Sequence, residues 1–536
     1  MSETKSVEAE CIAWASLPGA SPLFLDFLYQ FDKVSRFYAS SPHDLKQISA
    51  RHGRSDYPRE RREAVAAVLE RQNREFGSGV KTFENLQRLR EGAPVIVTGQ
   101  QVGLFGGPLF SILKALTAVM QAERAGAVPV FWMAAEDHDI AEIRSVDLPA
   151  GDHLQKITVN PTHPDGAQAG VVSLDGEITS ALQQAEALLG NSTTLDLLKE
   201  CYRPGETFAS SFAKFFARIF TDHGLVLLHP GDAELHRIAQ PVYRASLAKN
   251  REINERLQRR AEELESSGYH VQVKVTHSHT LCFYVNDGVR VPVRHGAEGF
   301  LIGERRVREA DLIAEAERCP ERFSANVLLR PAVQDYLLPT LCYIGGPAEI
   351  AYFAQVSVVY EQLLGHVTPI IPRISATLLE SRSEKLLHRY QLTLHDVFRG
   401  PEKLRELLAE KTIPQSVLRS FDEGEAHLEQ ALQVIRGTLE KLDLTLVDAA
   451  DNAGSKMRHQ IQSLREKAVR AEARKNAESQ RHADELSTLL YPGRQLQERG
   501  IGAAYFLLRY GTQILQTIKD GVQPGSIDHQ VLAVRI

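Results

Sequence analysis

The chain has 536 residues, with 62 Lys and Arg against 68 Asp and Glu, and its formal net charge is −6. A hydrophobic share of 43% and a charged share of 24% are ordinary for a globular protein with room for more than one domain. The acidic balance argues against a nucleic-acid-binding protein, and no apolar run reaches the roughly 18 residues that a membrane-spanning helix needs.

The first ten residues are polar and acidic, and the five cysteines are scattered without the spacing of a zinc site or a disulfide framework. These features predict no secretory signal and a reduced, cytoplasmic protein. We predict no bound metal.

Residues 1–380 alternate strand-like hydrophobic runs with helical patterns, which predicts an α/β fold with a Rossmann-like parallel sheet core. The five expected strands are Val95–Gly99, Val128–Ala134, Leu225–His229, Leu341–Gly345 and Val367–Pro372. The expected helices include Leu109–Ala125, Phe208–Phe220, Glu234–Leu264 and Ile350–Leu364.

Two stretches, at about 150–200 and 270–330, interrupt this alternation. Their short β-prone runs and turn residues predict antiparallel β-hairpins inserted into the core. The runs are Lys156–Asn160, Gly170–Leu174, His270–Thr276, Leu281–Asn286 and Val289–Arg294, and an Asn-Asp-Gly turn separates the last two.

Residues 381–490 are expected to be helical, with two hydrophobic seams of 3.5-residue period that predict a coiled coil. The two registers do not join, so we expect a helical hairpin with its break inside Leu444–Ser455, which contains Asn452 and Gly454. One helix with a skipped residue, or an amphipathic helix packed on the core, are the alternatives. The seams are Leu428, Leu432, Ile435, Leu439, Leu442 and Leu446, then Met457, Ile461, Leu464, Ala468 and Ala471. Residues 491–536 are expected to return to the core and to end in a strand at Val531–Val534.

A glycine-rich turn follows the first expected strand and precedes a helix. Its spacing fits neither a P-loop nor the GxGxxG pattern. Glycines allow a ligand to approach the backbone closely, and the two glutamines suit a ribose, an amide or an amino acid. A purely structural turn is the alternative, and Lys114 on the next helix is read as ordinary surface charge. The candidate binding residues are Gly99, Gln100, Gln101, Gly106 and Gly107.

Four ionisable residues, Glu136, Asp137, His138 and Asp139, follow the second expected strand. At the end of a strand in an α/β sheet they predict a site for a substrate amine or a metal, and His138 suits a general base. In the alternative interpretation, Asp139 caps the next helix and His138 packs beneath it.

Two further strand ends carry polar or glycine residues, so four of the five expected strands end in candidate site groups. Arg373 is suited to a phosphate or a carboxylate. The candidates here are Tyr343, Gly345, Gly346, Glu349, Arg373, Ser375 and Thr377.

Several of these blocks, in this order, resemble the BshC family of cysteine ligases, which is associated with bacillithiol biosynthesis. The resemblance covers nearly the whole chain. The blocks are Thr98–Pro108, Phe131-Trp132 with Glu136–Asp139, Arg330-Pro331 with Gln334-Asp335, Tyr343–Tyr352, Arg373 with Ser375 and Thr377, Leu490-Tyr491-Pro492 with Leu496–Arg499, and His529-Gln530-Val531.

The resemblance implies an architecture similar to class I aminoacyl-tRNA synthetases, with connecting-peptide insertions and a coiled coil that pairs two subunits into a homodimer. It implies an amide-forming reaction between L-cysteine and glucosaminyl malate, the last step of bacillithiol biosynthesis. By analogy with synthetases, ATP would activate the cysteine carboxylate, although both synthetase signature motifs are missing here.

In that reaction Arg373 would stabilise charge on a phosphate, and Glu136, Asp137 or Asp139 would hold the cysteine ammonium. His138 would take a proton from the attacking amine. A coiled-coil scaffold without enzymatic activity, a ligase for another amine acceptor, and a tRNA-binding synthetase relative are the alternatives.

Overall fold

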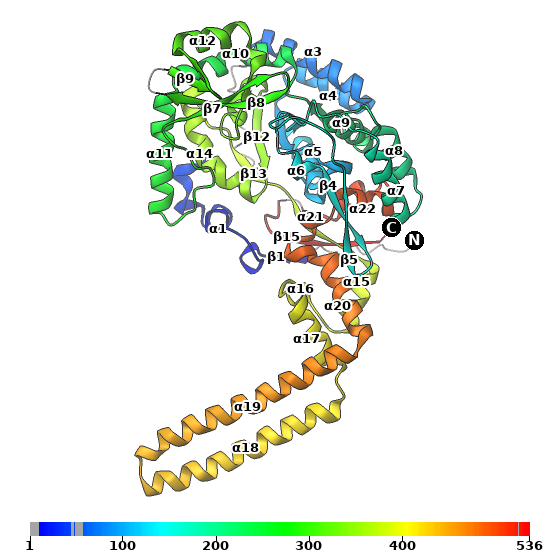
Figure 1. The fold of residues 1–536 in the computed structure, drawn as a ribbon, viewed down its shortest axis with the longest axis vertical. Coiled ribbons are helices and arrows are strands. Elements are labelled where there is room, and N and C mark those ends of the chain that lie inside the picture. The colour runs from blue at the N-terminus through cyan, green and yellow to red at the C-terminus, as the bar shows by residue number, and fades with distance from the viewer. Residues whose placement is uncertain (1–9, 44–47, 49–56, 297–298, 524, 536) are drawn as a thin grey trace. The chain divides into compact units, whose positions relative to one another are not determined.

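The computed structural model describes residues 10–43, 48, 57–296, 299–523 and 525–535 (Figure 1). The chain divides into two compact units. The first comprises Met1–Leu148, Gln155–Leu378 and Gln497–Ile536, and the second comprises Pro149–Leu154 and Leu379–Leu496.

A five-stranded parallel sheet forms the centre of the first unit, which confirms the predicted α/β core. Its strand order is β13-β12-β2-β3-β6, and every adjacent pair runs parallel. Hydrophobic, largely β-branched residues dominate these runs, as strands covered on both faces require. The strands are β2 (Val95–Gln100), β3 (Val128–Met133), β6 (Val226–Leu228), β12 (Thr340–Gly345) and β13 (Ile370–Pro372).

Helices connect these strands close to the expected positions. Helix α5 has the bounds that were predicted, and it packs against β2 and β3. The single helical pattern expected over Glu234–Leu264 is instead two helices, because the backbone leaves the helical conformation at Lys249 (φ −100°, ψ 12°). The helices are α5 (Leu109–Ala125), α9 (Phe208–Ile219), α10 (Ala233–Ala248), α11 (Asn250–Ser266) and α14 (Pro347–Leu363).

The second insertion contains an antiparallel sheet of order β10-β9-β8-β7-β11. The predicted turn joins β7 to β8, and both Asp287 (φ 48°) and Gly288 (φ 76°) have the positive φ of a type I′ hairpin. Residues His270–Thr276 are described by the structure and form no strand, contrary to the prediction. The strands are β7 (His279–Asn286), β8 (Val289–Gly296), β9 (Gly299–Ile302), β10 (Arg305–Val307) and β11 (Phe323–Ala325).

The first insertion differs more from the prediction. Strand β5 (His153–Thr158) overlaps the expected run, but it pairs with β4 (Ser145–Ala150). Residues Gly170–Leu174 form no strand, because their backbone amides bond to loops: Gly170 N donates to Ala135 O at 2.7 Å. The strand expected over Gly170–Leu174 was therefore wrong, and the expected run at Lys156 pairs instead with residues that precede it in the chain.

The second unit contains the predicted helical hairpin, formed by α18 (Gln415–Leu442) and α19 (Thr445–Lys475) (Figure 1). The break lies at Asp443 and Leu444, where the Asp443 carboxylate accepts the backbone N–H of Thr445 at 2.9 Å. Gly454 lies inside α19, where an added Cβ would stand 3.0 Å from Leu432 Cδ1. This glycine allows the two helices to approach closely and does not end either one. Helices α17 (Pro401–Thr412) and α20 (Ala477–Leu490) flank the hairpin in the chain.

The C-terminal residues return to the first unit, where β15 (His529–Val534) contains the expected final strand. It lies between β1 (Glu10–Ile12) and β14 (Ser375–Glu380) in a three-stranded sheet. None of the helices in the described part of the chain combines the length and hydrophobicity that a membrane crossing requires.

Candidate active site

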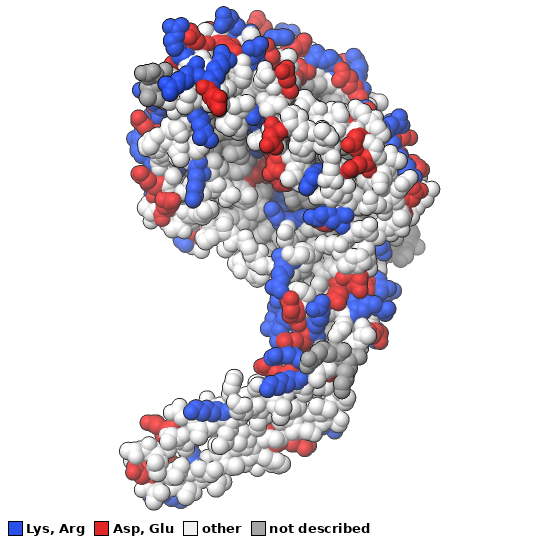
Figure 2. Space-filling model, in the orientation of Figure 1, with Lys and Arg blue, Asp and Glu red and all other residues white. Residues whose placement is uncertain are grey.

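The predicted site residues gather at the carboxyl edge of the central sheet, where β2, β3, β12 and β13 end. Open parallel sheets bind their ligands at this edge. In Figure 2 the visible face of the first unit is hollowed, and acidic and basic side chains border the hollow. Within the described ranges, His, Cys, Asp and Glu side chains form no group of three that would hold a metal ion.

Asp137 anchors the acidic loop that follows β3. Its Oδ1 accepts the backbone N–H of His138 at 2.8 Å, and its Oδ2 accepts Gln101 Nε2 at 2.9 Å. Burial alone would raise the pKa of Asp137, but the Gln101 hydrogen bond and the charge of Arg290 hold it below its usual value. Asp137 is therefore a carboxylate at neutral pH, and Gln101 ties the first glycine turn to this loop.

Glu136 points into the protein and pairs with a residue that sequence patterns did not reveal. Its Oε1 lies 3.4 Å from Nε2 of His236 on α10, whose ring stacks on Tyr243. Burial alone would raise the pKa of Glu136 and lower that of His236, but the attraction between the two groups reverses both shifts. His236 was not predicted as a site residue, because a single histidine in an amphipathic helix does not indicate which residue it contacts in the folded protein.

His138 lies at the open side of the same loop, with 41% of its side chain exposed. Its Nδ1 is 3.4 Å from Nη1 of Arg290, which reaches the loop from β8 of the second insertion. Asp139 Oδ1 accepts the backbone N–H of Glu142 at 3.2 Å and caps the short helix α6 (Ile140–Ile143). The structure therefore confirms one half of the alternative interpretation, in which Asp139 caps the next helix. It does not confirm the other half, because His138 is exposed and does not pack beneath that helix.

Lys114, expected at the surface, is buried beneath the ends of β2 and β12. Its Nζ donates to Gly99 O at 2.7 Å and to Gln100 Oε1 at 3.0 Å, and it forms an ion pair with Glu349. Burial lowers the pKa of Lys114 to about 8, and the Glu349 carboxylate limits that fall.

Glu349 also accepts two hydrogen bonds from residues of its own turn. Tyr343 Oη donates to Oε1 at 2.7 Å, and Gly346 N donates to Oε2 at 2.7 Å. Burial alone would raise the pKa of Glu349, but Lys114 and the Gly346 N–H hold it below its usual value. Five predicted binding residues from two glycine turns, namely Gly99, Gln100, Tyr343, Gly346 and Glu349, therefore meet around one missed lysine.

The predicted glycine turns are themselves tightly packed. Gly106 (φ 90°) and Gly107 (φ 70°) are buried, and their N–H groups bond to Tyr202 Oη at 3.1 Å and Leu104 O at 3.0 Å. At Gly345 an added Cβ would lie 2.6 Å from Ile370 Cδ1. These glycines allow close packing of the turns, and their role in phosphate binding stays a prediction.

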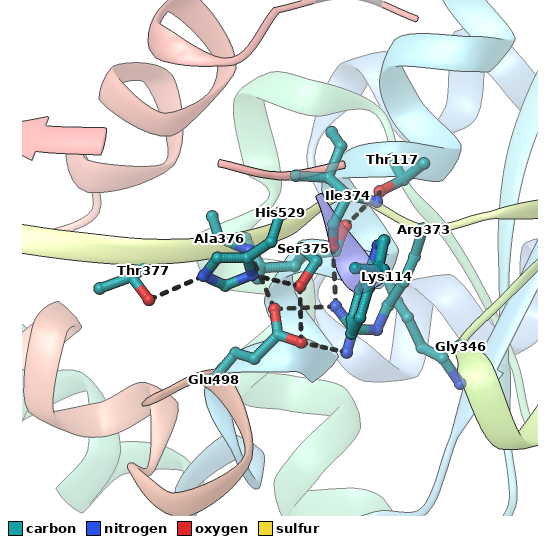
Figure 3. A network of polar contacts seen from close by, with 12 residues as sticks. Lys114, Thr117, Gly346, Arg373, Ile374, Ser375, Ala376, Thr377, Glu498 and His529 are labelled. Carbon is teal, nitrogen blue, oxygen red and sulfur yellow. Dashed lines mark hydrogen bonds and ion pairs between the residues drawn. The ribbon is translucent and has the colours of Figure 1, made fainter. Parts of the chain in front are cut away.

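Arg373 was predicted to bind phosphate, but its guanidinium is engaged inside the protein (Figure 3). It donates to both carboxylate oxygens of Glu498 on α21 (Gln497–Gly500), at 2.9 and 2.5 Å. The side chains of Arg373 and Glu498 are 3% and 0% exposed, so this is a buried, bidentate ion pair. This contact gives Arg373 a structural role, and its predicted role toward phosphate is untested.

Ser375 and Thr377 belong to the same buried network (Figure 3). Ser375 Oγ donates to Glu498 Oε1 at 3.0 Å, so it accepts from Nδ1 of His529 at 2.7 Å. The other ring nitrogen, Nε2, then accepts from Thr377 Oγ1 at 2.9 Å. The network joins the segment after β13 to α21 and β15, whose partner residues are distant in sequence.

Comparison with known proteins agrees with this two-part layout. Residues 7–374 match the family model for the N-terminal Rossmann-like domain of bacillithiol biosynthesis BshC, and residues 376–534 match the model for its C-terminal coiled-coil domain. The chain belongs to the BshC family.

Relatives in the BshC family align with this chain almost from end to end. A protein of Koribacter versatilis is 45% identical over 533 residues, and one of Solibacter usitatus is 34% identical over 531. Both alignments cover 98% of this chain and 99% of the relative. A Salinibacter ruber protein is 32% identical over 534 residues, covering 96% of this chain and 97% of its own. Each is named "Putative cysteine ligase BshC".

The buried Arg373–Glu498 pair is expected to contribute strongly to the stability of the fold. Replacing Glu498 by Gln leaves a buried guanidinium without its counter-charge, and such a change costs about 3–5 kcal/mol. We expect a large drop in the urea midpoint of unfolding. The control, Glu234→Gln, removes an exposed partner of Arg71 and should cost less than about 1 kcal/mol. Equal shifts for the two variants would contradict the structural role of the pair.

The buried His529 is expected to make the stability of the fold depend on pH. Burial lowers the pKa of His529 from 6.5 to about 4, so the folded protein keeps this ring neutral. Between pH 6.5 and 4 the unfolded chain binds a proton that the folded chain does not, and stability therefore falls as the pH drops through this range. The contribution is on the order of 3 kcal/mol.

The measurement is the free energy of unfolding against pH for the wild type and His529→Gln. The variant should show a shallower decline between pH 6.5 and 4. His277→Gln, at an exposed position, should keep the wild-type slope. An unchanged slope in His529→Gln would show that this residue does not contribute to acid sensitivity.

Proposed function

We propose that this protein is a cysteine ligase that joins the carboxyl group of L-cysteine to the amine of glucosaminyl malate, as the last step of bacillithiol biosynthesis. Membership of the BshC family over nearly the whole chain is the observation that carries the proposal. The acidic loop after β3 supports it, because a carboxylate at the edge of a parallel sheet suits the ammonium of an amino acid.

A free carboxylate does not react with an amine, so we include ATP as the activating co-substrate. A cysteine carboxylate oxygen would attack the α-phosphorus and release pyrophosphate. The amine nitrogen would then attack the carbonyl carbon, so that a C–N bond forms while the C–O bond to AMP breaks. The nitrogen would lose its proton to water or to a carboxylate of the loop.

Within this scheme we assign the cysteine ammonium to Asp137. The site keeps this residue ionised and fixed in place, since Gln101 and the His138 backbone hold its two oxygens. A fixed carboxylate recognises an ammonium without the cost of reorganising at the moment of binding.

Asp137→Asn tests this assignment. The change keeps the shape and removes the charge, and a hydrogen bond to a charged group contributes about 1.5–3 kcal/mol, which corresponds to a roughly 10- to 150-fold effect. We expect kcat/KM to fall by that factor, mainly through a higher KM for cysteine. The measurement is mass spectrometry of the amide product at varied cysteine concentrations.

The control is Asp311→Asn, which removes an exposed carboxylate paired with Arg308 on the insertion. An unchanged KM for cysteine in Asp137→Asn would overturn the assignment. If the wild type makes no amide with glucosaminyl malate and ATP, the ligase proposal fails for that acceptor, and product with another amine would identify the alternative ligase. No product with any amine would favour a scaffold.

We also propose that the α18–α19 hairpin pairs two copies of the chain. The coiled-coil family match supports this, as does the exposure of large apolar residues on the hairpin. Exposed hydrophobic surface on this scale is typical of an interaction site. The residues include Ile435, Leu442, Met457 and Leu464, which are 50%, 75%, 49% and 59% exposed.

Leu464→Glu tests the pairing, because a carboxylate placed in a hydrophobic interface is strongly unfavourable. The variant should be monomeric by size-exclusion chromatography with light scattering, with unchanged helical circular dichroism. Gln462→Glu adds the same charge at an exposed position two residues away and should stay dimeric. A dimeric Leu464→Glu variant would place the interface elsewhere.

A further inference from the structure

The contact between Arg290 and His138 fixes where the imidazole carries its proton. A guanidinium stays protonated and has only donors, so Nδ1 of His138, 3.4 Å from Nη1, must accept. A neutral imidazole then carries its one proton on Nε2. We propose that Arg290 is a positioning residue that holds His138 as this tautomer, and that His138 donates a hydrogen bond to the reacting oxygen instead of acting as the base.

The competing tautomer would place the proton on Nδ1, directed at Asp137. The Oδ1 atom of Asp137 is 3.8 Å from Nδ1, beyond hydrogen-bond distance, and it already accepts the backbone N–H groups of His138 and Asp139. This comparison favours the tautomer with its proton on Nε2.

Arg290 is held firmly enough to impose this choice. Its Nη2 donates to Ala325 O at 2.7 Å, and its guanidinium carbon lies 3.9 Å from the centre of the Phe283 ring. The side chain is buried, and the backbone N–H of Arg290 bonds to Gly166 O at 2.9 Å. The same Phe283 ring contacts His138, with ring centres 5.6 Å apart. The insertion therefore supplies both Arg290, the hydrogen-bond donor, and Phe283, the aromatic ring that packs against the imidazole.

This inference rests on the proposed ligase function and gives His138 a defined part in it. When the amine attacks the activated carbonyl, negative charge develops on the carbonyl oxygen. A donor that reaches that oxygen lowers the barrier, and losing one such donor typically costs about 10²–10³-fold in kcat. Neither ring nitrogen is then free to act as the base, so the proton of the amine goes to water or to a carboxylate of the loop.

A pair of amide variants separates a donor from a base. Glutamine places an N–H near the position of Nε2, asparagine places its amide near Nδ1, and neither is a base. As a donor, His138→Gln should keep kcat within about 10-fold of the wild type, whereas His138→Asn and His138→Ala should lose about 10²–10³-fold. Equal, severe losses in all three variants would overturn the donor role.

The tautomer is measured without substrate, by ¹⁵N NMR of histidine-labelled protein with the signal assigned from its loss in His138→Gln. We expect a protonated Nε2 and an unprotonated Nδ1 in the wild type. Arg290→Met should shift both signals toward a mixture, and Arg290→Lys, which keeps a cationic donor, should restore part of the wild-type pattern. A protonated Nδ1 in the wild type would overturn the proposal even if Arg290→Met fails to fold.

The two readouts also separate this inference from the ligase proposal. If the wild type forms no amide, the ligase function and the donor role fail together, while the NMR spectrum still decides whether Arg290 fixes the tautomer. If amide forms and the spectrum shows Nδ1–H, the ligase function stands and the inference fails.

Discussion

The ion pair between Lys114 and Glu349 lies beneath the carboxyl ends of β2 and β12, where both side chains are largely removed from water. A buried ammonium or carboxylate is costly unless a counter-charge and hydrogen bonds compensate it. Here the backbone carbonyl of Gly99, the Gln100 amide, Tyr343 and the Gly346 N–H provide those contacts. The two glycine turns are thereby fixed to each other at the edge of the sheet.

The same constraint separates buried, paired groups from accessible ones at this edge. Glu136 with His236, and Arg373 with Glu498, are charges whose partners lie inside the protein. His138, by contrast, is considerably exposed. The paired charges set the positions of the loops, and the acidic loop carries a histidine that is open to solvent.

The sequence predicted the sheet well because its strands are short hydrophobic runs bounded by turn residues, a local property. The turn at Asp287 and Gly288 was predictable for the same reason. The run over His270–Thr276 alternates valine with polar residues, a strand-like pattern, but forms no strand, since pairing depends on a neighbouring backbone that the pattern does not describe. The helix break was expected within Leu444–Ser455, which contains Gly454, but this glycine lies inside a helix, where its missing side chain leaves room for Leu432 of the facing helix.

The location of the candidate site could be predicted from the sequence, but the partners of its charged residues could not. Polar residues at strand ends located the edge, because parallel strands bring their carboxyl ends together. Arg290 and His236 come from elements without a distinctive motif, and only the folded chain brings them to Glu136, Asp137 and His138. Lys114 was misjudged because one lysine in an apolar helix gives no indication of a buried carboxylate opposite it.

The exposure of His138 beside a fixed guanidinium has a consequence for the chemistry. In an adenylate route the leaving group is a phosphate monoester, which departs as a stable anion and needs no proton from the enzyme. The demanding step is the build-up of charge on the carbonyl oxygen as the amine attacks. A preorganised donor addresses that step directly, because it stabilises the developing charge without reorganising at the moment of reaction. In the proposed adenylate route the enzyme therefore need not supply an acid for the leaving group, and the N–H of His138 would act on the carbonyl oxygen while the amine proton goes to water or to a carboxylate of the loop.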